Sequence, residues 1–492
     1  MTAPWDVLVV GGGTAGIVTA KTAASFGARV LLVERERTGG DCLWTGCVPS
    51  KALLAAASAA AGARDAGRLG VEAGRITVEF HKVMEHVRSA IHTIEPVDSP
   101  EALEEAGVRV AFGHVTFTDP HGAQLDGEHL RFTQAVVCTG SSPLLPPIPG
   151  LADAGPLTSD SVWDLRELPA RLAVLGGGSI GCELGQAFAR LGSHVTIVEG
   201  ADQILTREAP EAAGLVASSL ARDGVRLVTG VPVVEVKSGT DSGALVLEDG
   251  STVEFDRVLV SVGRRPRTQG LGLDLAGVEV DERGYVRVDP HLRTTNRDIW
   301  AAGDVTGHPQ FTHLAGVSGS LAASNAVLGL RRRLDTTTVP RVTFTHPEVA
   351  AVGVAPETAK DSPGLHAVSW DHRHLDRAIA ESDVQGSTTL VLDGKGRLVG
   401  ATIVGPRAGE SLGELTLAVR HGMRTRDIAG TTHAYPTYSD GAWNASIRDV
   451  RERLGAPTAA RTIRALASVR RRWLRSPVRR GFGNRPRPAP ER

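Results

Sequence analysis

Cysteine and long apolar runs are scarce in this sequence. Its 492 residues include only four cysteines, at positions 42, 47, 138 and 182. A secreted protein held together by disulfides is usually much richer in cysteine, so we expect a cytoplasmic protein. No apolar run approaches the roughly 18 residues of a membrane-spanning helix, and no signal peptide precedes the first apolar segment. With 41% hydrophobic and 22% charged residues, the composition is that of a soluble globular protein.

Charge is unevenly distributed, although the net charge is only −1. Residues 456–492 contain eleven arginines and one glutamate, a balance of +10, which leaves −11 for the preceding 455 residues. Their Pro, Arg and Gly content predicts a poorly ordered tail over 455–492. A basic amphipathic segment within this tail can contact anionic lipid, and the alternative is a solvated extension; we expect no nucleic-acid partner. The apolar residues at helical spacing are Ile463, Leu466, Val469 and Trp473.

The most specific signal is a motif that occurs twice. Each copy has an apolar run, a Gly-x-Gly-x-x-Gly turn, a small-residue helix and a second apolar run that ends on an acid. The three glycines allow a tight turn, close approach of a pyrophosphate and close helix–strand packing, and the acid binds a ribose hydroxyl. We therefore expect two dinucleotide-binding units. The first copy has Gly11, Gly13, Gly16 and Glu34, and the second has Gly176, Gly178, Gly181 and Glu199, with 23 residues from first glycine to acid in both.

Further strand ends and a change of pattern predict the domain organisation. From about residue 337, short alternating strands are followed by helices. We expect an α/β fold with two Rossmann-like dinucleotide-binding domains and a C-terminal α+β dimerisation domain. Turn residues after three other apolar runs are assigned to nucleotide binding: Thr139 and Gly140, Gly263, and Gly303 with Asp304. The predicted boundaries are 1–150 and 290–336 for the first domain, 151–289 for the second, 337–454 for the third and 455–492 for the tail.

Cys42 and Cys47 form the second specific motif. Four residues separate them, and Gly46 permits the tight turn that a disulfide between them would need. A helix is expected just beyond, and a thiolate near its N-terminus has a lowered pKa, which favours thiol–disulfide exchange. The alternative is a pair of structural cysteines. Cys138 and Cys182 lie in apolar strand and helix contexts, so we expect both in the core.

From about Asp6 to Leu454 the sequence resembles the pyridine nucleotide–disulfide oxidoreductases, which include dihydrolipoamide dehydrogenase, glutathione reductase and mercuric reductase. The resemblance rests on both glycine loops, the segment 39–51 around the cysteines, the segment 302–304 and the segment 408–410. It implies FAD at the first loop, a nicotinamide cofactor at the second, and a homodimer in which the last domain completes the active site of the other subunit.

The same resemblance implies roles for the residues around the flavin. Cys42 would attack the substrate, and Cys47 would face the flavin and form the charge-transfer complex. Lys51 would lie near flavin N5 in an ion pair with Glu183, because a buried cation needs a partner. Asp304 would hold the ribityl chain of FAD.

The choice of nicotinamide depends on Glu199. A carboxylate at the end of this strand accepts hydrogen bonds from a free 2′-hydroxyl and repels a 2′-phosphate. No arginine occurs in residues 200–206 to bind such a phosphate, and Arg207 comes late. We therefore expect NADH to be preferred over NADPH.

The last domain departs from most of the family. Dihydrolipoamide dehydrogenase and glutathione reductase have a His and a Glu where this chain has Tyr435 and Asp440. A His with a pKa near 6.5 can take a proton from the attacking thiol at neutral pH, whereas a Tyr near 10 is poorly matched. His433 is the alternative base. Mercuric reductase also has a Tyr at this position, but its vicinal cysteine pair near the C-terminus is missing here, since no cysteine follows Cys182.

These features together predict an NAD(P)H-dependent FAD oxidoreductase of the mercuric-reductase-like branch. Electrons would pass through the flavin to the disulfide Cys42–Cys47 and on to an unidentified acceptor, in a role in cell redox homeostasis. The alternatives are a dihydrolipoamide dehydrogenase and a quinone reductase that acts directly at the flavin. No metal site is predicted.

Overall fold

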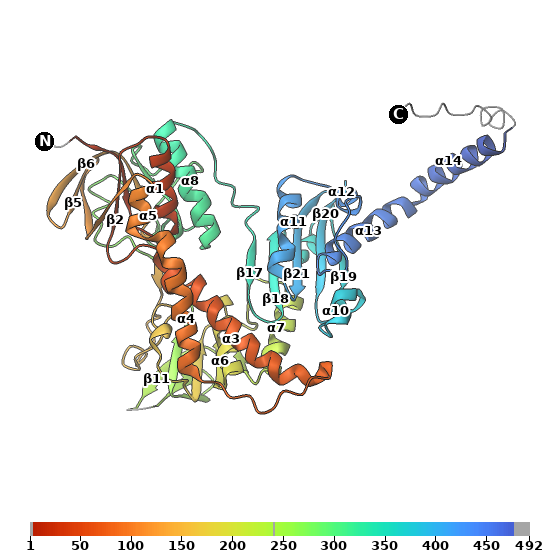
Figure 1. Ribbon diagram of the computed structural model, residues 1–492, viewed down its shortest axis with the longest axis horizontal. Coiled ribbons are helices and arrows are strands. Elements are labelled where there is room, and N and C mark those ends of the chain that lie inside the picture. Colours follow the sequence, from red (N-terminus) through yellow and green to blue (C-terminus); the bar gives the residue numbers. More distant parts are fainter. Residues whose placement is uncertain (1–2, 240–241, 477–492) are drawn as a thin grey trace, which may run out of the picture. The chain divides into compact units, whose positions relative to one another are not determined.

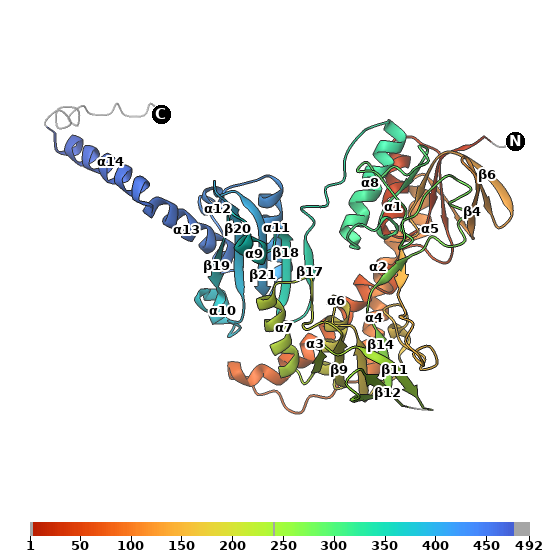
Figure 2. The same cartoon turned by 180° about the vertical axis from the view of Figure 1, so that it is seen from behind.

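The chain folds into two units in a computed structural model that describes residues 3–239 and 242–476 (Figures 1 and 2). The first unit comprises Met1–Ala351 and Val404–Gly409, and the second comprises Val352–Ile403 and Glu410–Arg492. Both glycine repeats lie in the first unit. None of the helices in the described part of the chain combines the length and the apolarity needed to cross a bilayer.

The first glycine repeat forms the centre of a seven-stranded sheet with the order β3-β2-β1-β6-β5-β4, in which β16 also pairs with β6. β1 is parallel to both β2 and β6. Because both faces of such strands are covered, residues 7–10 of β1 are all apolar and at most 4% exposed. Helices α1 (Thr14–Ser25) and α8 (Thr312–Leu328) pack together and contribute to the core on one face. The strands are β1 (Trp5–Val10), β2 (Val30–Glu34), β3 (Val108–Phe112), β4 (Val115–Asp119), β5 (Gly122–Leu125), β6 (Glu128–Val137) and β16 (Ile299–Ala301).

The second repeat forms a separate parallel sheet with the order β10-β9-β8-β14. A three-stranded antiparallel sheet, β11-β12-β13, adds to the core on one side of it, and a two-stranded ribbon joins β7 to β15. The elements are β7 (Ser141–Pro143), β8 (Arg171–Leu175), α6 (Ser179–Leu191), β9 (His194–Glu199), α7 (Pro210–Arg222), β10 (Arg226–Thr229), β11 (Val233–Ser238), β12 (Gly243–Leu247), β13 (Thr252–Phe255), β14 (Arg257–Val260) and β15 (Arg264–Pro266).

The cysteine motif begins a helical segment between β2 and β3. Helix α3 packs against both α4 and α6, and so links the cysteine motif to the second sheet. α4 buries residues at positions 80, 84, 87 and 91, the spacing of one helical face, and each such side chain stabilises the fold by about 1.5–3 kcal/mol. The helices are α2 (Gly40–Trp44), α3 (Cys47–Asp65), α4 (Phe80–Ile94) and α5 (Pro100–Glu105).

The second unit has an antiparallel pair, β19 with β20, covered by α13. Its elements, with the strands that lead into it, are β17 (Arg341–Thr343), β18 (Glu348–Gly353), α9 (Pro356–Asp361), β19 (Leu365–Asp371), α10 (Asp376–Ala380), β20 (Ser387–Asp393), β21 (Leu398–Gly405), α11 (Ala408–Arg420), α12 (Thr425–Ala429), α13 (Asp440–Gly455) and α14 (Pro457–Arg475). The three predicted domains and the tail are a finer division than the two units, and their boundaries stay predictions.

The structure differs from the sequence expectation in the tail. Residues 457–475 form the regular helix α14, although a poorly ordered tail is predicted from residue 455. The reason is local: this stretch is rich in Ala, Leu and Arg, which favour helices, and its one proline is at the first turn. Apart from Gly455, the glycines and the other prolines of the tail all follow residue 476, outside the described residues.

Candidate active site

The two glycine turns have nearly the same geometry. The first glycine of each turn, Gly11 and Gly176, has φ of 106° and 108°, a region that side chains with a Cβ rarely adopt. The third glycine allows the helix to approach the strand. A Cβ on Gly16 would lie 1.8 Å from the Gly11 carbonyl oxygen, and one on Gly181 would lie 2.0 Å from that of Gly176. Both turns therefore require the first and third glycines of the motif.

The two acids are also held in the same way. The backbone N–H of Gly12 donates to Glu34 over 2.6 Å, and that of Gly177 donates to Glu199 over 2.7 Å. The other oxygen of each carboxylate accepts the N–H two residues further on, at 2.9 Å in both cases. Each carboxylate is thus fixed beside its glycine turn with lone pairs remaining, which is the arrangement needed to accept a ribose hydroxyl.

A cleft of about 970 Å³ opens beside the first turn. It is large enough for a dinucleotide, and residues from many separate stretches of sequence line it. Neither the three glycines of the second motif nor Glu199 lines this cleft. Residues in the N-terminal part of α6, which follows that motif, do line it. The predicted site residues that the structure brings together here are Gly11, Gly13, Glu34, Cys42, Cys47, Lys51, Thr139, Gly140, Glu183, Gly303 and Asp304.

Asp304 lies against this cleft in a network that the sequence did not reveal. The Ser141 hydroxyl donates to Asp304 over 2.7 Å, and the Arg264 guanidinium donates to the same hydroxyl and forms an ion pair with Asp41 at 3.0 Å. Burial raises the pKa of Asp304, and the hydrogen bond from Ser141 and the charge of Arg264 oppose this shift. The network fixes the Asp304 carboxylate at the wall of the cleft.

Cys42 and Cys47 lie at the junction of two helices. Cys42 is in α2 and Cys47 begins α3, so Cys47 lies at the positive, N-terminal end of the α3 dipole. Both cysteines are reduced. The Thr312 hydroxyl, at the start of α8, lies 3.2 Å from the Cys47 sulfur. Thr312 is 265 residues away in the chain, and no sequence pattern predicted its contact with the cysteine pair.

The two thiols have opposite electrostatic environments. A hydrogen bond from Cys42 is the main cause that lowers the pKa of Cys47, to about 6; burial opposes it, and Thr312 and the Lys51 charge assist it. The same hydrogen bond, followed by burial, raises the pKa of Cys42. At neutral pH the reduced pair therefore carries one proton, on Cys42, and a thiolate on Cys47.

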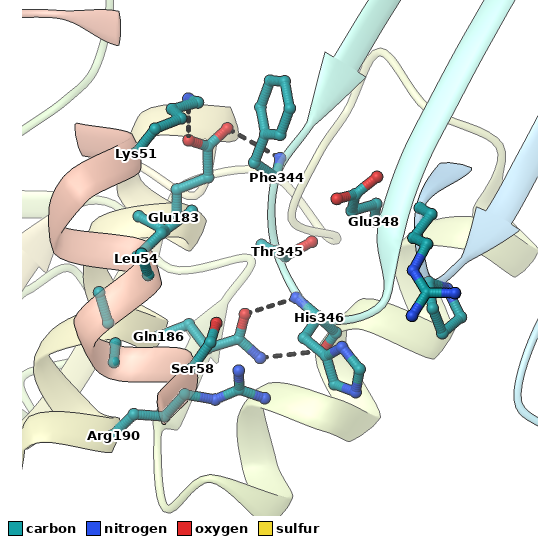
Figure 3. A pocket seen from close by; sticks show the side chains of 15 residues that line it. Lys51, Leu54, Ser58, Glu183, Gln186, Arg190, Phe344, Thr345, His346 and Glu348 are labelled. Carbon is teal, nitrogen blue, oxygen red and sulfur yellow. Dashed lines mark hydrogen bonds and ion pairs between the residues drawn. The ribbon is translucent and has the colours of Figure 1, made fainter. Parts of the chain in front are cut away.

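The ion pair implied between Lys51 and Glu183 is present. The Lys51 ammonium lies 2.8 Å from the carboxylate, whose side chain is 8% exposed. The other carboxylate oxygen accepts the backbone N–H of Phe344 over 3.0 Å, as Figure 3 shows. The Lys51 ammonium also lies 4.1 Å from the centre of the Phe344 ring, within the range of a cation–π interaction. Phe344 is a contact that the sequence did not reveal.

The remaining two cysteines are core residues. Cys138 is 5% exposed and Cys182 is 0% exposed. Burial is the main cause that raises the pKa of Cys138 to about 12, and it also raises that of Cys182. Neither thiol has the lowered pKa or the exposure that a reactive cysteine needs.

Tyr435 and Asp440 lie in the second unit and have separate partners there. The Tyr435 hydroxyl donates to the Asp376 carboxylate, and this hydrogen bond raises the pKa of Tyr435. Asp440 instead accepts the backbone N–H of Thr437 over 3.0 Å, just before α13. Tyr435 is 71% exposed and Asp440 is 4% exposed. The carboxylate that orients the phenol is thus Asp376, which lies 59 residues earlier and which no motif indicated.

His433 is fully engaged within the second unit. Its Nδ1 lies 3.0 Å from the Thr431 carbonyl oxygen, and its Nε2 lies 2.9 Å from a Glu414 carboxylate oxygen. Both ring nitrogens therefore already have hydrogen-bond partners within the second unit. The side chain is 9% exposed. Among the described residues, no group of three or more His, Cys, Asp or Glu is placed to hold a metal ion.

Comparison with known proteins shows which family the chain belongs to. Residues 5–319 match the family model described as pyridine nucleotide-disulphide oxidoreductase, and residues 339–446 match the dimerisation domain of that family. The chain belongs to the pyridine nucleotide-disulphide oxidoreductases. This finding confirms the predicted α/β architecture and the predicted enzyme class, a flavoprotein disulfide oxidoreductase that uses FAD and a pyridine nucleotide.

The relatives have two different activities by name. A mercuric reductase from Staphylococcus aureus is 34% identical over 444 residues, which is 89% of this chain and 81% of the relative. A dihydrolipoyl dehydrogenase from Geobacillus stearothermophilus is 35% identical over 452 residues, 90% of this chain and 95% of the relative. The relatives therefore leave the acceptor open.

Solved structures give the same result for the fold. The Cu(II) complex of RclA from Escherichia coli, an HOCl-induced flavoprotein disulfide reductase, has a TM-score of 0.82 and 27% identity, covering 90% of this chain and 99% of the other. LpdA from Mycobacterium tuberculosis has a TM-score of 0.83 and 28% identity with the same coverage. The residues of the first cleft fit FAD, and Gly11, Glu34, Lys51 and Asp304 would hold it. When bound, FAD supplies the electron relay between nicotinamide and disulfide.

Proposed function

We propose that this family member passes electrons from NADH to the pair Cys42–Cys47 and on to a thiophilic acceptor, as a mercuric-reductase-like enzyme. The observation that carries the proposal is the environment of Tyr435. Its hydroxyl donates to Asp376 and has a raised pKa, so it acts as a hydrogen-bond donor and not as a base. An acceptor that binds sulfur directly has less need of the missing His–Glu pair.

The two sulfurs of the cysteine pair lie in different environments, which determine where the proton goes when the disulfide is reduced. Two electrons and one proton enter, the S–S bond breaks, Cys42 receives the proton, and Cys47 is released as a thiolate. The lowered pKa of Cys47 and the raised pKa of Cys42 support this distribution. Lys51 holds a positive charge beside the pair, and Glu183 keeps that cation in place.

The acceptor class follows from what the reduced pair can do. Attack on a disulfide acceptor would require Cys42 to lose its proton, and Tyr435 is not a base for it at neutral pH. A soft metal ion, in contrast, binds to thiolate sulfur by its own Lewis acidity. The Cys42 and Cys47 sulfurs, both on the cleft, are the ligands that we expect it to use.

An anaerobic acceptor screen with the NADH-reduced holoenzyme tests the proposal. We expect faster turnover with Hg(II) or another thiophilic ion than with glutathione disulfide or lipoamide, and loss of that turnover in Cys42→Ser. Preferential reaction with lipoamide would assign the enzyme as a dihydrolipoamide dehydrogenase. If Cys42→Ser reduces quinones as fast as wild type does, and no tested acceptor requires the cysteine, the acceptor takes its electrons directly from the flavin.

The preference for NADH is part of the same proposal. The Glu199 carboxylate is fixed by two backbone N–H groups at the end of β9, where it would accept the 2′-hydroxyl of NADH and repel the 2′-phosphate of NADPH. The measurement is kcat/KM for each nucleotide with wild type and with Glu199→Gln. A wild-type preference for NADPH would contradict it. We further propose a cytoplasmic homodimer that acts in cell redox homeostasis.

A further inference from the structure

Helix α14 has a composition unlike the rest of the chain. Its 19 residues, Pro457–Arg475, include six arginines and no acidic residue, and none of them is buried. The preceding helix α13 packs against β19 and β20 of the same unit, whereas α14 continues away from those strands in both views (Figures 1 and 2). The helix is therefore a solvent-exposed extension of the second unit.

The two faces of α14 are chemically distinct. At 100° per residue, five apolar side chains fall on one side, and each is between 36% and 65% exposed. Five of the six arginines fall on the opposite side. The sixth, Arg470, lies among the apolar residues with its guanidinium 4.3 Å from the Trp473 ring centre. The apolar side chains are Ile463, Leu466, Val469, Trp473 and Leu474.

We propose that α14 binds in the plane of an anionic lipid bilayer. Its apolar face would enter the boundary between headgroups and acyl chains, and its arginines would remain among the anionic headgroups. A helix of this length is about 28 Å long, and its six charges prevent it from spanning the bilayer. The indole of Trp473 belongs at the same interface, since one side of it is apolar and its N–H is polar.

Lipid fits both faces of this helix at once. A nucleic acid would neutralise the arginines but would leave the apolar side chains in water. A hydrophobic groove on a protein would take the apolar face but would leave five arginines without anions. An anionic surface with an apolar interior satisfies both, and the absence of any acid in α14 removes internal competition for the arginines.

The test uses the full-length holoenzyme and sedimentation with lipid vesicles. We expect at least tenfold stronger binding to vesicles with 30% phosphatidylserine than to pure phosphatidylcholine, and weaker binding as salt increases. Leu466→Asp with Val469→Asp should lower binding to the anionic vesicles at least tenfold. The matched control is Leu69→Asp with Val71→Asp, which makes the same change at exposed positions of the first unit and should bind as wild type does.

Two further readouts separate this proposal from its competitors. Tryptophan quenching by brominated lipid should occur in wild type and be reduced in Trp473→Phe. Absence of vesicle binding at low salt, or equal binding by wild type and the Leu466/Val469 variant, would overturn the proposal. Tight binding to duplex DNA that the Leu466/Val469 variant retains, with no vesicle binding, would replace it with a nucleic-acid role. NADH-dependent turnover in solution should be unchanged in all three variants.

Discussion

Cys47 is the residue whose environment is most directly measurable. Its pKa is lowered to about 6, so its thiolate persists above that pH and is lost as the pH falls through about 6. The absorbance that arises from contact between this thiolate and the flavin in NADH-reduced enzyme should titrate with the same midpoint. An unchanged absorbance between pH 8 and pH 5 would contradict the assignment of the thiolate to Cys47.

Thr312 should contribute to that midpoint. Its hydroxyl lies 3.2 Å from the Cys47 sulfur and favours the thiolate. A hydrogen bond to a charged group contributes about 1.5–3 kcal/mol, so Thr312→Val should move the midpoint upward by about one to two pH units. Thr312→Ser retains the hydroxyl and should titrate like wild type. If Thr312→Val titrates like wild type as well, the hydroxyl does not stabilise the thiolate.

Tyr435 and Asp376 should act together on the acceptor. Tyr435→Phe removes the donor, and we expect at least a tenfold loss of acceptor turnover while reduction of the enzyme by NADH is unchanged. Asp376→Asn retains a hydrogen-bonding partner for the phenol but removes the charge that raises the Tyr435 pKa. It should therefore retain more activity than Tyr435→Phe. Stopped-flow measurement of the two half-reactions separates the effects, and an equal loss in both would contradict a role confined to the acceptor.

At the scale of elements, the two glycine turns can be tested against each other. Gly16→Ala places a Cβ 1.8 Å from a backbone oxygen of the first turn, and Gly181→Ala does so at 2.0 Å in the second. Gly16→Ala should lose FAD, whereas Gly181→Ala should retain FAD and lose rapid reduction by NADH. Gly214→Ala in α7 is the control, because no heavy atom lies within 4 Å of the added carbon. The measurements are flavin content and the rate of flavin reduction.

Local motifs explain what the sequence could predict. Each glycine turn and the cysteine segment is contained within about 25 residues, so strand, turn, helix and acid can be read together. The contacts of Thr312, Phe344 and Asp376 with site residues join parts of the chain from 59 to 293 residues apart, and no local pattern encodes them. Asp440 illustrates the limit. It stands where most relatives have a Glu, yet in the structure it accepts the Thr437 N–H, and the phenol of Tyr435 binds Asp376 instead.

For the whole molecule, the central question is which subunit completes each active site. The match to the family's dimerisation domain suggests a homodimer. The resemblance further implies that Tyr435 of one subunit serves the cysteine pair of the other. The structure describes a single chain, in which Cys42 belongs to the first unit and Tyr435 to the second. The dimer hypothesis can therefore be tested by placing the two defects in different subunits.

Hybrid dimers of Cys42→Ser with Tyr435→Phe provide this test. If Tyr435 acts across the dimer, one of the two sites in each hybrid is wild type and the other carries both defects. Acceptor turnover should then recover to about half of the wild-type value per dimer, although each parent homodimer is inactive or strongly impaired. If Tyr435 acts within its own subunit, each site carries one defect and no recovery occurs. Purification through two different affinity tags isolates the hybrid. The control is a dimer in which both subunits carry Cys42→Ser, one under each tag. It contains no intact site in either arrangement.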